Sequence, residues 1–123
     1  MILADTSIWI GHLRTADPIL IELLEAGEVL THPMVIGELA CGTMPRRDEV
    51  LGALLDLPAA SVATDPELLQ FIDRHRLMRR GIGYIDVHLL AATLLSTHTR
   101  LWTADARLAA VAARLFVSFT PGR

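Results

Sequence analysis

The sequence has little cysteine: Cys41 is the single one among 123 residues. One thiol cannot form a disulfide within the chain, and it cannot build a zinc site from several cysteines. An intracellular, reducing compartment is therefore expected, namely the cytoplasm. We expect Cys41 itself to be a small core residue.

Long apolar runs are also missing, because charged residues interrupt each apolar stretch before it could span a bilayer. The N-terminus lacks the basic segment that opens a secretory signal. We therefore expect no association with a membrane.

Lysine is absent, so arginine supplies all 11 of the basic residues, and the formal net charge is −3. This balance argues against a protein that coats DNA by bulk positive charge, but a nuclease whose acids bind metal remains possible. Arginine binds phosphate with better geometry than lysine does. A GC-rich genome would produce the same bias, and we favour that simpler interpretation.

The composition is that of one globular domain, residues 1–123, with 52% hydrophobic residues and no repeat or linker. A chain of this length buries roughly two thirds of its unfolded surface. The apolar excess leaves room for an exposed patch that contacts a partner.

Short apolar runs alternate with segments that have helical start and stop signals, such as Asp17-Pro18 before one helix and Gly27 after it. Alternation of this kind favours an α/β fold with a parallel sheet covered on both sides. Strands are expected at 2–4, 28–31, 60–63, 100–103 and 116–119, and helices at 8–10 with Ser7 as N-cap, 18–26, 34–41, 46–55, 65–80, 84–96 and 105–115.

Two acids each follow an apolar strand directly, Asp5 after residues 2–4 and Asp105 after residues 100–103. Either could simply cap the next helix. Because the carboxyl ends of parallel strands meet at one edge of a sheet, where ligands bind, these two carboxylates are also expected to converge.

Two further acids lie on predicted helices. Glu38 is surrounded by apolar and small residues, so it either points to solvent or has a partner, and we favour a cation as that partner. Asp86 could be only a first-turn acid favoured by the helix dipole. Four carboxylates at one edge would repel each other unless a divalent cation lay among them, and oxygen ligands suit Mg²⁺ or Mn²⁺ better than zinc.

Four motifs resemble the PIN domain family: Asp5-Thr6-Ser7, Gly37-Glu38-Leu39, Asp86 followed by Leu-Ala-Ala-Thr at 90–93, and Leu-Trp-Thr-Ala-Asp at 101–105. The length is similar to that of the bacterial VapC-type toxins. The resemblance implies a three-layer α/β/α sandwich with a mostly five-stranded parallel sheet in the order 3-2-1-4-5. It also implies an endoribonuclease that depends on Mg²⁺ or Mn²⁺.

Carried over by this resemblance, the catalytic and metal-binding residues are Asp5, Glu38, Asp86 and Asp105. Ser7 and Thr103 match hydroxyl positions that hold those carboxylates or waters. The implied partners are an RNA substrate (transfer or ribosomal RNA), a VapB-type antitoxin that neutralises the toxin, and a second copy of the chain in a homodimer.

Two groups of arginines, Arg46 with Arg47 and Arg76 with Arg79 and Arg80, could bind an RNA backbone or could form solvated faces. We expect the second group to share one helix face. The five histidines are scattered, which favours surface or packing roles over zinc. Trp9 could be core or could line a groove that receives an antitoxin helix.

The sequence can also be compared with two other phosphoryl-transfer folds and with a non-catalytic module. A receiver domain needs a lysine, which is absent, and a haloacid-dehalogenase phosphatase needs Asp-x-Asp, whereas Asp5 is followed by Thr6 and Ser7. A non-catalytic module that binds RNA or protein is the alternative from a different class. Metal-independent RNA binding without cleavage would favour it.

Overall fold

A computed structural model describes residues 1–122 of the chain; the expected domain also includes Arg123, which lies outside the described residues. The central strand is β1 (Ile2–Ala4), and it pairs in parallel with β2 (Val29–Leu30) and β3 (Arg100–Trp102) in the order β2-β1-β3. Leu3 is completely buried and lies opposite Leu101 in register. The carboxyl ends of the three strands therefore share one edge.

The α/β fold with a parallel sheet is confirmed, but the expected number of five strands is wrong, since three strands form within residues 1–122. The two edge segments each make one isolated parallel bridge, Thr31 with Ala59 and Leu101 with Ser118. The first bridge also lies before the expected range of 60–63. One neighbouring residue there is Pro58, which has no N–H to extend the pairing.

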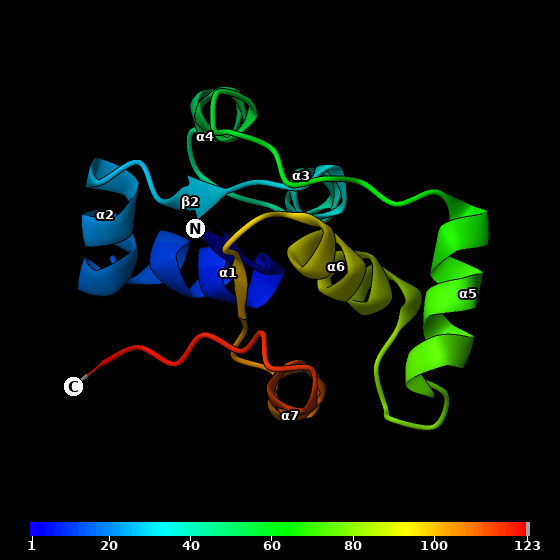
Figure 1. Ribbon diagram of the computed structural model, residues 1–123. Coiled ribbons are helices and arrows are strands. Elements are labelled where there is room, and N and C mark those ends of the chain that lie inside the picture. The colour runs from blue at the N-terminus through cyan, green and yellow to red at the C-terminus, as the bar shows by residue number, and fades with distance from the viewer. Residues whose placement is uncertain (123) are drawn as a thin grey trace.

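Seven helices pack around the sheet in the described part of the chain (Figure 1). None of the described helices is long and apolar enough to cross a membrane. They are α1 (Thr6–Arg14), α2 (Pro18–Glu25), α3 (Pro33–Cys41), α4 (Arg47–Leu55), α5 (Asp65–His75), α6 (Tyr84–Leu95) and α7 (Ala106–Arg114).

Helix α6 is the most deeply buried helix, with every residue from 87 to 93 inside the core. A helix that is apolar on all sides is stable only when other elements cover it. Here α6 contacts β3 on one side and α5 on another, and Figure 1 shows α5 as the outer of the two helices. The first turn of α6, which contains Asp86, is thus attached to the rigid centre of the molecule.

The predicted bounds of two helices are wrong, and α1 also continues to Arg14 rather than ending at residue 10. Helix α1 begins at Thr6 rather than after Ser7, because the Asp5 side chain accepts the N-cap hydrogen bond from Ile8 N. Helix α5 ends at His75 rather than Arg80, because Arg76 adopts a left-handed backbone with a φ of 52° and buried Leu77 then bonds back to Ile72 O.

One consequence of the shorter α5 concerns the second arginine group. Arg76 is the C-cap of α5, and Arg79 and Arg80 lie beyond the helix. The expectation that they share one helix face is therefore wrong. The expectation for Cys41 is also wrong, because its side chain is exposed at the end of α3, whereas Trp9 is part of the core.

Two of the histidines pack inside the molecule, as expected for packing residues. His32 is fully buried, and its Nδ1 accepts a hydrogen bond of 3.0 Å from Met34 N as the N-cap of α3. Its ring lies 5.8 Å from the ring of His88, which is also buried. Burial, reinforced by the neighbouring His88, lowers the pKa of His32 to about 4.

This shift predicts that the protein loses stability as the pH falls from 6.5 towards 4. Over that interval the unfolded chain binds a proton at His32 and the folded chain does not, so the free energy of unfolding should decrease by about 2–3 kcal/mol. Urea unfolding at a series of pH values would measure the slope. In His32→Asn, whose amide can still cap α3, the slope should be shallower; an unchanged slope would contradict the assignment.

Candidate active site

Asp5 lies at the carboxyl end of the central strand β1, next to the end of β3. Its backbone N–H donates to Trp102 O at 3.0 Å, so the residue directly follows β1 and is paired with the end of β3. The side chain is 6% exposed. Its Oδ1 accepts from Ser7 Oγ at 2.5 Å and Ile8 N at 3.2 Å, and its Oδ2 accepts from the hydroxyl of Thr103. These donors offset the cost of burying the carboxylate.

The two hydroxyls also connect Asp5 to the turn that follows β3. Ser7 Oγ accepts from Ala104 N, and Thr103 Oγ1 accepts from Asp105 N, each at 3.0 Å. Each hydroxyl therefore donates to the carboxylate and accepts from the backbone. This circuit fixes the start of α1 relative to the start of α7.

Asp105 is the N-cap of α7, and its Oδ1 accepts from Arg107 N and Leu108 N at 2.9 Å each. Asp86 lies in the first turn of α6, where its Oδ2 accepts from Gly83 N at 3.1 Å. The capping interpretation is therefore correct for both acids. It does not compete with a further role, because a capping carboxylate keeps free lone pairs on its oxygens.

The charges of the other two acids also affect the pKa of Asp86. Burial raises the pKa of Asp86, the hydrogen bond from Gly83 opposes that shift, and the charges of Asp105 and Asp5 raise the pKa further. The carboxylates of Asp5 and Asp105, from two other segments, therefore lie near enough to Asp86 for their charges to act on it. The sequence argument from the carboxyl ends of parallel strands predicted this arrangement for Asp5 and Asp105.

Glu38 is bonded to a different kind of partner from the cation that the sequence analysis favoured. Its side chain is exposed on α3, and its Oε1 accepts a hydrogen bond of 2.5 Å from the hydroxyl of Thr6. Glu38 therefore has a partner, but in this structure that partner is a hydroxyl. It also lines a pocket of about 230 Å³ with Leu13 and Met44.

Thr6 was not identified from the sequence as a site residue. Its position beside Asp5 gives no signal for Glu38, which is 32 residues away. The contact arises because α1 packs against α3. Thr6 thereby connects the fourth acid to the segment that holds the first.

The donor set fits a hard divalent cation, since it consists of carboxylate and hydroxyl oxygens. The repulsion felt by Asp86 would be relieved by a positive charge among the acids. Within residues 1–122, no three His, Cys, Asp or Glu side chains are already placed to hold a metal ion together. Here each acid accepts a hydrogen bond from a hydroxyl or a backbone N–H, and its remaining lone pairs are the ones that a cation would use.

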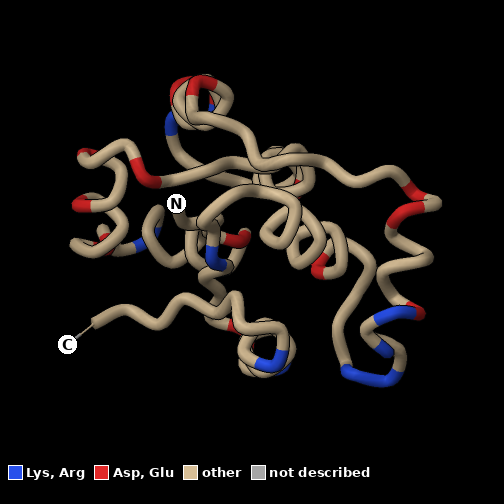
Figure 2. Tube along the Cα trace, in the orientation of Figure 1, with Lys and Arg blue, Asp and Glu red and all other residues tan. Residues whose placement is uncertain are grey.

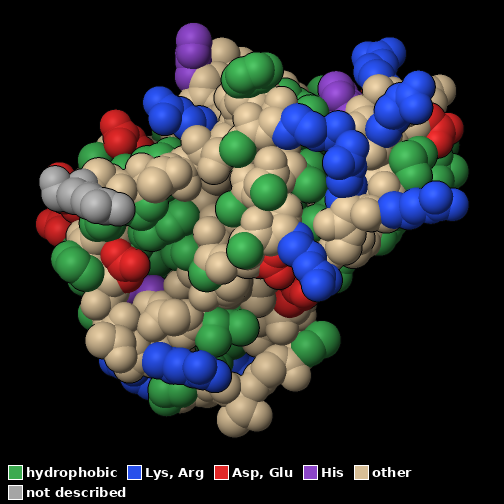
Figure 3. Space-filling view, turned by 90° about the horizontal axis from the view of Figure 1, so that it is seen from below, with side chains coloured by type: hydrophobic (Ala, Val, Ile, Leu, Met, Phe, Trp, Pro, Cys, Tyr) green, Lys and Arg blue, Asp and Glu red, His purple; other side chains and the backbone are tan. Residues whose placement is uncertain are grey.

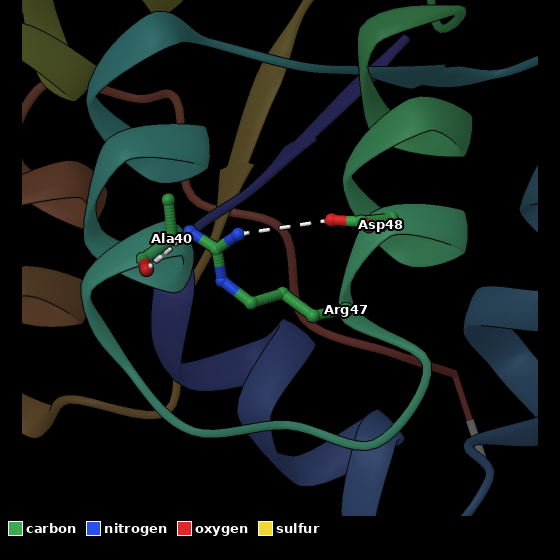
Figure 4. A network of polar contacts seen from close by, with 3 residues as sticks. All are labelled: Ala40, Arg47 and Asp48. Atoms are coloured by element: carbon green, nitrogen blue, oxygen red, sulfur yellow. Dashed lines mark hydrogen bonds and ion pairs between the residues drawn. The ribbon is translucent and has the colours of Figure 1, made fainter.

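The two arginine groups lie in different places. Figure 2 shows the loop after α5, which contains Arg76, Arg79 and Arg80, at the opposite end of the molecule from α4. On α4, Arg47 Nη2 donates to Ala40 O at 2.9 Å, and Nη1 lies 3.9 Å from Asp48 Oδ1 (Figure 4). Arg47 therefore joins α4 to the end of α3.

The profile of the PIN domain family matches residues 2–114, a span that includes all four acids. The chain belongs to the PIN domain family. It is also 49% identical over 113 residues to the protein named Ribonuclease VapC32 of Mycobacterium tuberculosis strain ATCC 25618 / H37Rv, and equally so to Ribonuclease VapC32 of strain CDC 1551 / Oshkosh. Each comparison covers 92% of this chain and 91% of the relative.

Within this PIN domain, the hydroxyl of Thr103 is predicted to contribute to stability through Asp5. Thr103→Val should lower the free energy of unfolding by about 1–3 kcal/mol, because a buried carboxylate oxygen loses its donor. Thr103→Ser keeps the hydroxyl and should lose less. Chemical denaturation of the three proteins would measure this, and equal losses in both variants would contradict it.

The repulsion among the acids predicts a response to metal. Mn²⁺ should raise the melting temperature by several degrees when it is well above its Kd, because the folded protein alone presents the assembled acids. Asp86→Asn should raise the melting temperature of the metal-free PIN domain and reduce the shift caused by Mn²⁺. Asp48→Asn, at a fully exposed position on α4, is the matched control. A melting temperature that does not respond to Mn²⁺ would argue against a clustered site.

Proposed function

We propose that this protein is an endoribonuclease toxin of the VapC type, dependent on Mg²⁺ or Mn²⁺ and neutralised by a VapB-type antitoxin. The observation that carries the proposal is the convergence of Asp5, Asp86 and Asp105, in a chain that is 49% identical to proteins named ribonuclease. Transfer or ribosomal RNA in the cytoplasm is the proposed substrate.

All four acids would contribute to one cation site in this proposal. Asp5, Asp86 and Asp105 would hold the cation, and Glu38 would complete the set from α3. When bound, a divalent cation supplies positive charge to a phosphodiester and lowers the pKa of water. The contribution of the chain is orientation: Ser7 and Thr103 hold both oxygens of Asp5, and such supporting hydrogen bonds keep ligands in position.

A three-layer α/β/α arrangement around the strand order β2-β1-β3, extended at each edge by a single bridge, is part of the same proposal. It is supported by the two isolated bridges, which place Ala59 next to the end of β2 and Ser118 next to β3. In that order β1 lies at the centre, and the acids that follow β1 and β3 are neighbours.

The proposed partners need accessible apolar surface, both for the antitoxin and for a second copy in a homodimer. Large hydrophobic side chains are exposed at Leu69 and Leu95, on α5 and α6, and at Phe116 after α7. A cavity of about 380 Å³ between α5 and α6 is lined by Phe71 and Leu94 among others. These features support partner binding in general and do not assign one partner to one surface.

Cleavage of total RNA by the purified chain, free of any co-expressed partner, tests the nuclease. Discrete fragments are expected with Mg²⁺ or Mn²⁺ and none with EDTA. Asp5→Asn should reduce the rate by more than about a hundredfold while the protein stays folded, because the site loses a charge that cannot be replaced. Asp48→Asn should cleave as the parent does.

The result separates the nuclease from a non-catalytic binding module. Full metal-dependent cleavage by Asp5→Asn would refute the assigned site. RNA binding that is equal with and without EDTA, and never followed by cleavage, would support the binding module instead.

A further inference from the structure

The segment between α5 and α6, residues 76–83, is here named the arginine loop. It contains Arg76, Arg79 and Arg80, and it follows Arg74 in the last turn of α5. Arg76 and Arg79 have positive φ values of 52° and 62°. A left-handed backbone costs a non-glycine residue roughly 1–2 kcal/mol. Contacts with the rest of the molecule must therefore hold the loop in this shape.

Helix α7 provides those contacts. Arg114 Nη2 donates to His75 O at 2.6 Å, which fixes the end of α5 where the loop begins. Gly81, with a φ of 75°, lies against the side chain of Arg107: a Cβ added at Gly81 would be 2.7 Å from Arg107 Cδ. The loop is thus held over the side of α7 at two points.

The same contacts place the loop beside the acids. Arg107 is two residues after Asp105, and the loop ends at Gly83, whose N–H donates to Asp86. Figure 3 shows basic side chains, all of which are arginines in this chain, gathered towards one end of a face that has a group of acids near its middle. Positive charge therefore lies next to the carboxylates without lying among them.

The arginines of the loop are not neutralised by the protein itself. Among residues 1–122 the one ion pair within 4.0 Å joins Arg47 to Asp48 on α4. Arg80 Nε is bonded to Arg76 O at 3.2 Å, which orients its guanidinium but leaves its charge unpaired. In a chain with a net charge of −3, this concentration of free positive charge is local.

We propose that the arginine loop binds the RNA backbone next to the phosphate that is cleaved, with Arg79 and Arg80 contacting phosphates and Arg107 positioning the loop through Gly81. The inference rests on the proposed nuclease function. RNA is favoured over an acidic protein because the loop borders the acids that would act on the same strand. A backbone that continues past those acids brings its next phosphates to the loop.

The test is binding of a fluorescein-labelled single-stranded oligoribonucleotide of mixed sequence, measured by fluorescence anisotropy in EDTA. Arg79→Gln with Arg80→Gln should weaken binding by roughly tenfold, and the dependence of log Kd on log salt should become shallower by about 1.4, since two phosphate contacts are lost. With Mg²⁺, the RNA concentration for half-maximal cleavage should rise by a similar factor, while cleavage at saturating RNA stays nearly constant.

The matched control removes one charge elsewhere, in Arg100→Gln, and is compared with Arg79→Gln alone, which should weaken binding severalfold. Arg100 begins β3 at the edge of the sheet opposite to the acids. Arg100→Gln should bind RNA as the parent does. Equal weakening by Arg100→Gln and Arg79→Gln would overturn the proposal in favour of bulk charge. Unchanged binding in the loop variant would also overturn it and would leave an acidic partner as the ligand of the loop.

A variant that keeps all charges tests the geometry. Gly81→Ala strains the backbone and displaces Arg107, so RNA binding should weaken severalfold with the salt dependence nearly unchanged. Thermal melting verifies that the variant is folded, and Gly52→Ala, which has open space around it on α4, is the control. Because these assays use EDTA, they remain informative if the protein proves not to cleave RNA. A folded Gly81→Ala variant with parental affinity would contradict the positioning role of Arg107.

Discussion

The buried carboxylate of Asp5 is the group on which the site depends, because it joins the central strand β1 to β3 and to the helices that follow these two strands. Both of its oxygens accept hydrogen bonds, and the hydroxyls of Ser7 and Thr103 in turn accept from the backbone of the turn after β3. A carboxylate in this position without donors would cost several kcal/mol. The circuit therefore requires β1 and β3 to be paired in one register, and that pairing places Asp105 beside Asp5.

Opposing electrostatic effects act on the acids. Helices α1 and α7 begin directly after an acid and α6 has an acid in its first turn, and the free N–H groups and dipoles of these N-termini favour negative charge there. The charges of Asp5 and Asp105 nevertheless raise the pKa of Asp86. Helix capping thus favours negative charge at these positions, and a positive charge placed among the acids would relieve the remaining repulsion. The arginine loop borders this cluster and presents cations to the solvent side.

The sequence predicted strands and site residues correctly where the structure depends on a few neighbouring residues. An apolar run followed by an acid predicted β1 and Asp5, and the same pattern predicted β3 and Asp105. The motifs also indicated the PIN domain family, which the family comparison confirms. Predictions were wrong where the local signal was weak. Arg76 ends α5 without the glycine that usually marks a left-handed C-cap.

By itself, the sequence determined the chain order of the seven helices and of the strands β1, β2 and β3, and the residue type at each acidic position, because strand burial and helix capping act over a few residues. Tertiary structure alone decided which distant groups meet. Thr6 reaches Glu38 because α1 packs on α3, and Arg107 lies against Gly81 because α7 packs beside the loop after α5. Such contacts join residues that are tens of positions apart, and no periodicity or spacing in the chain encodes the distance between them.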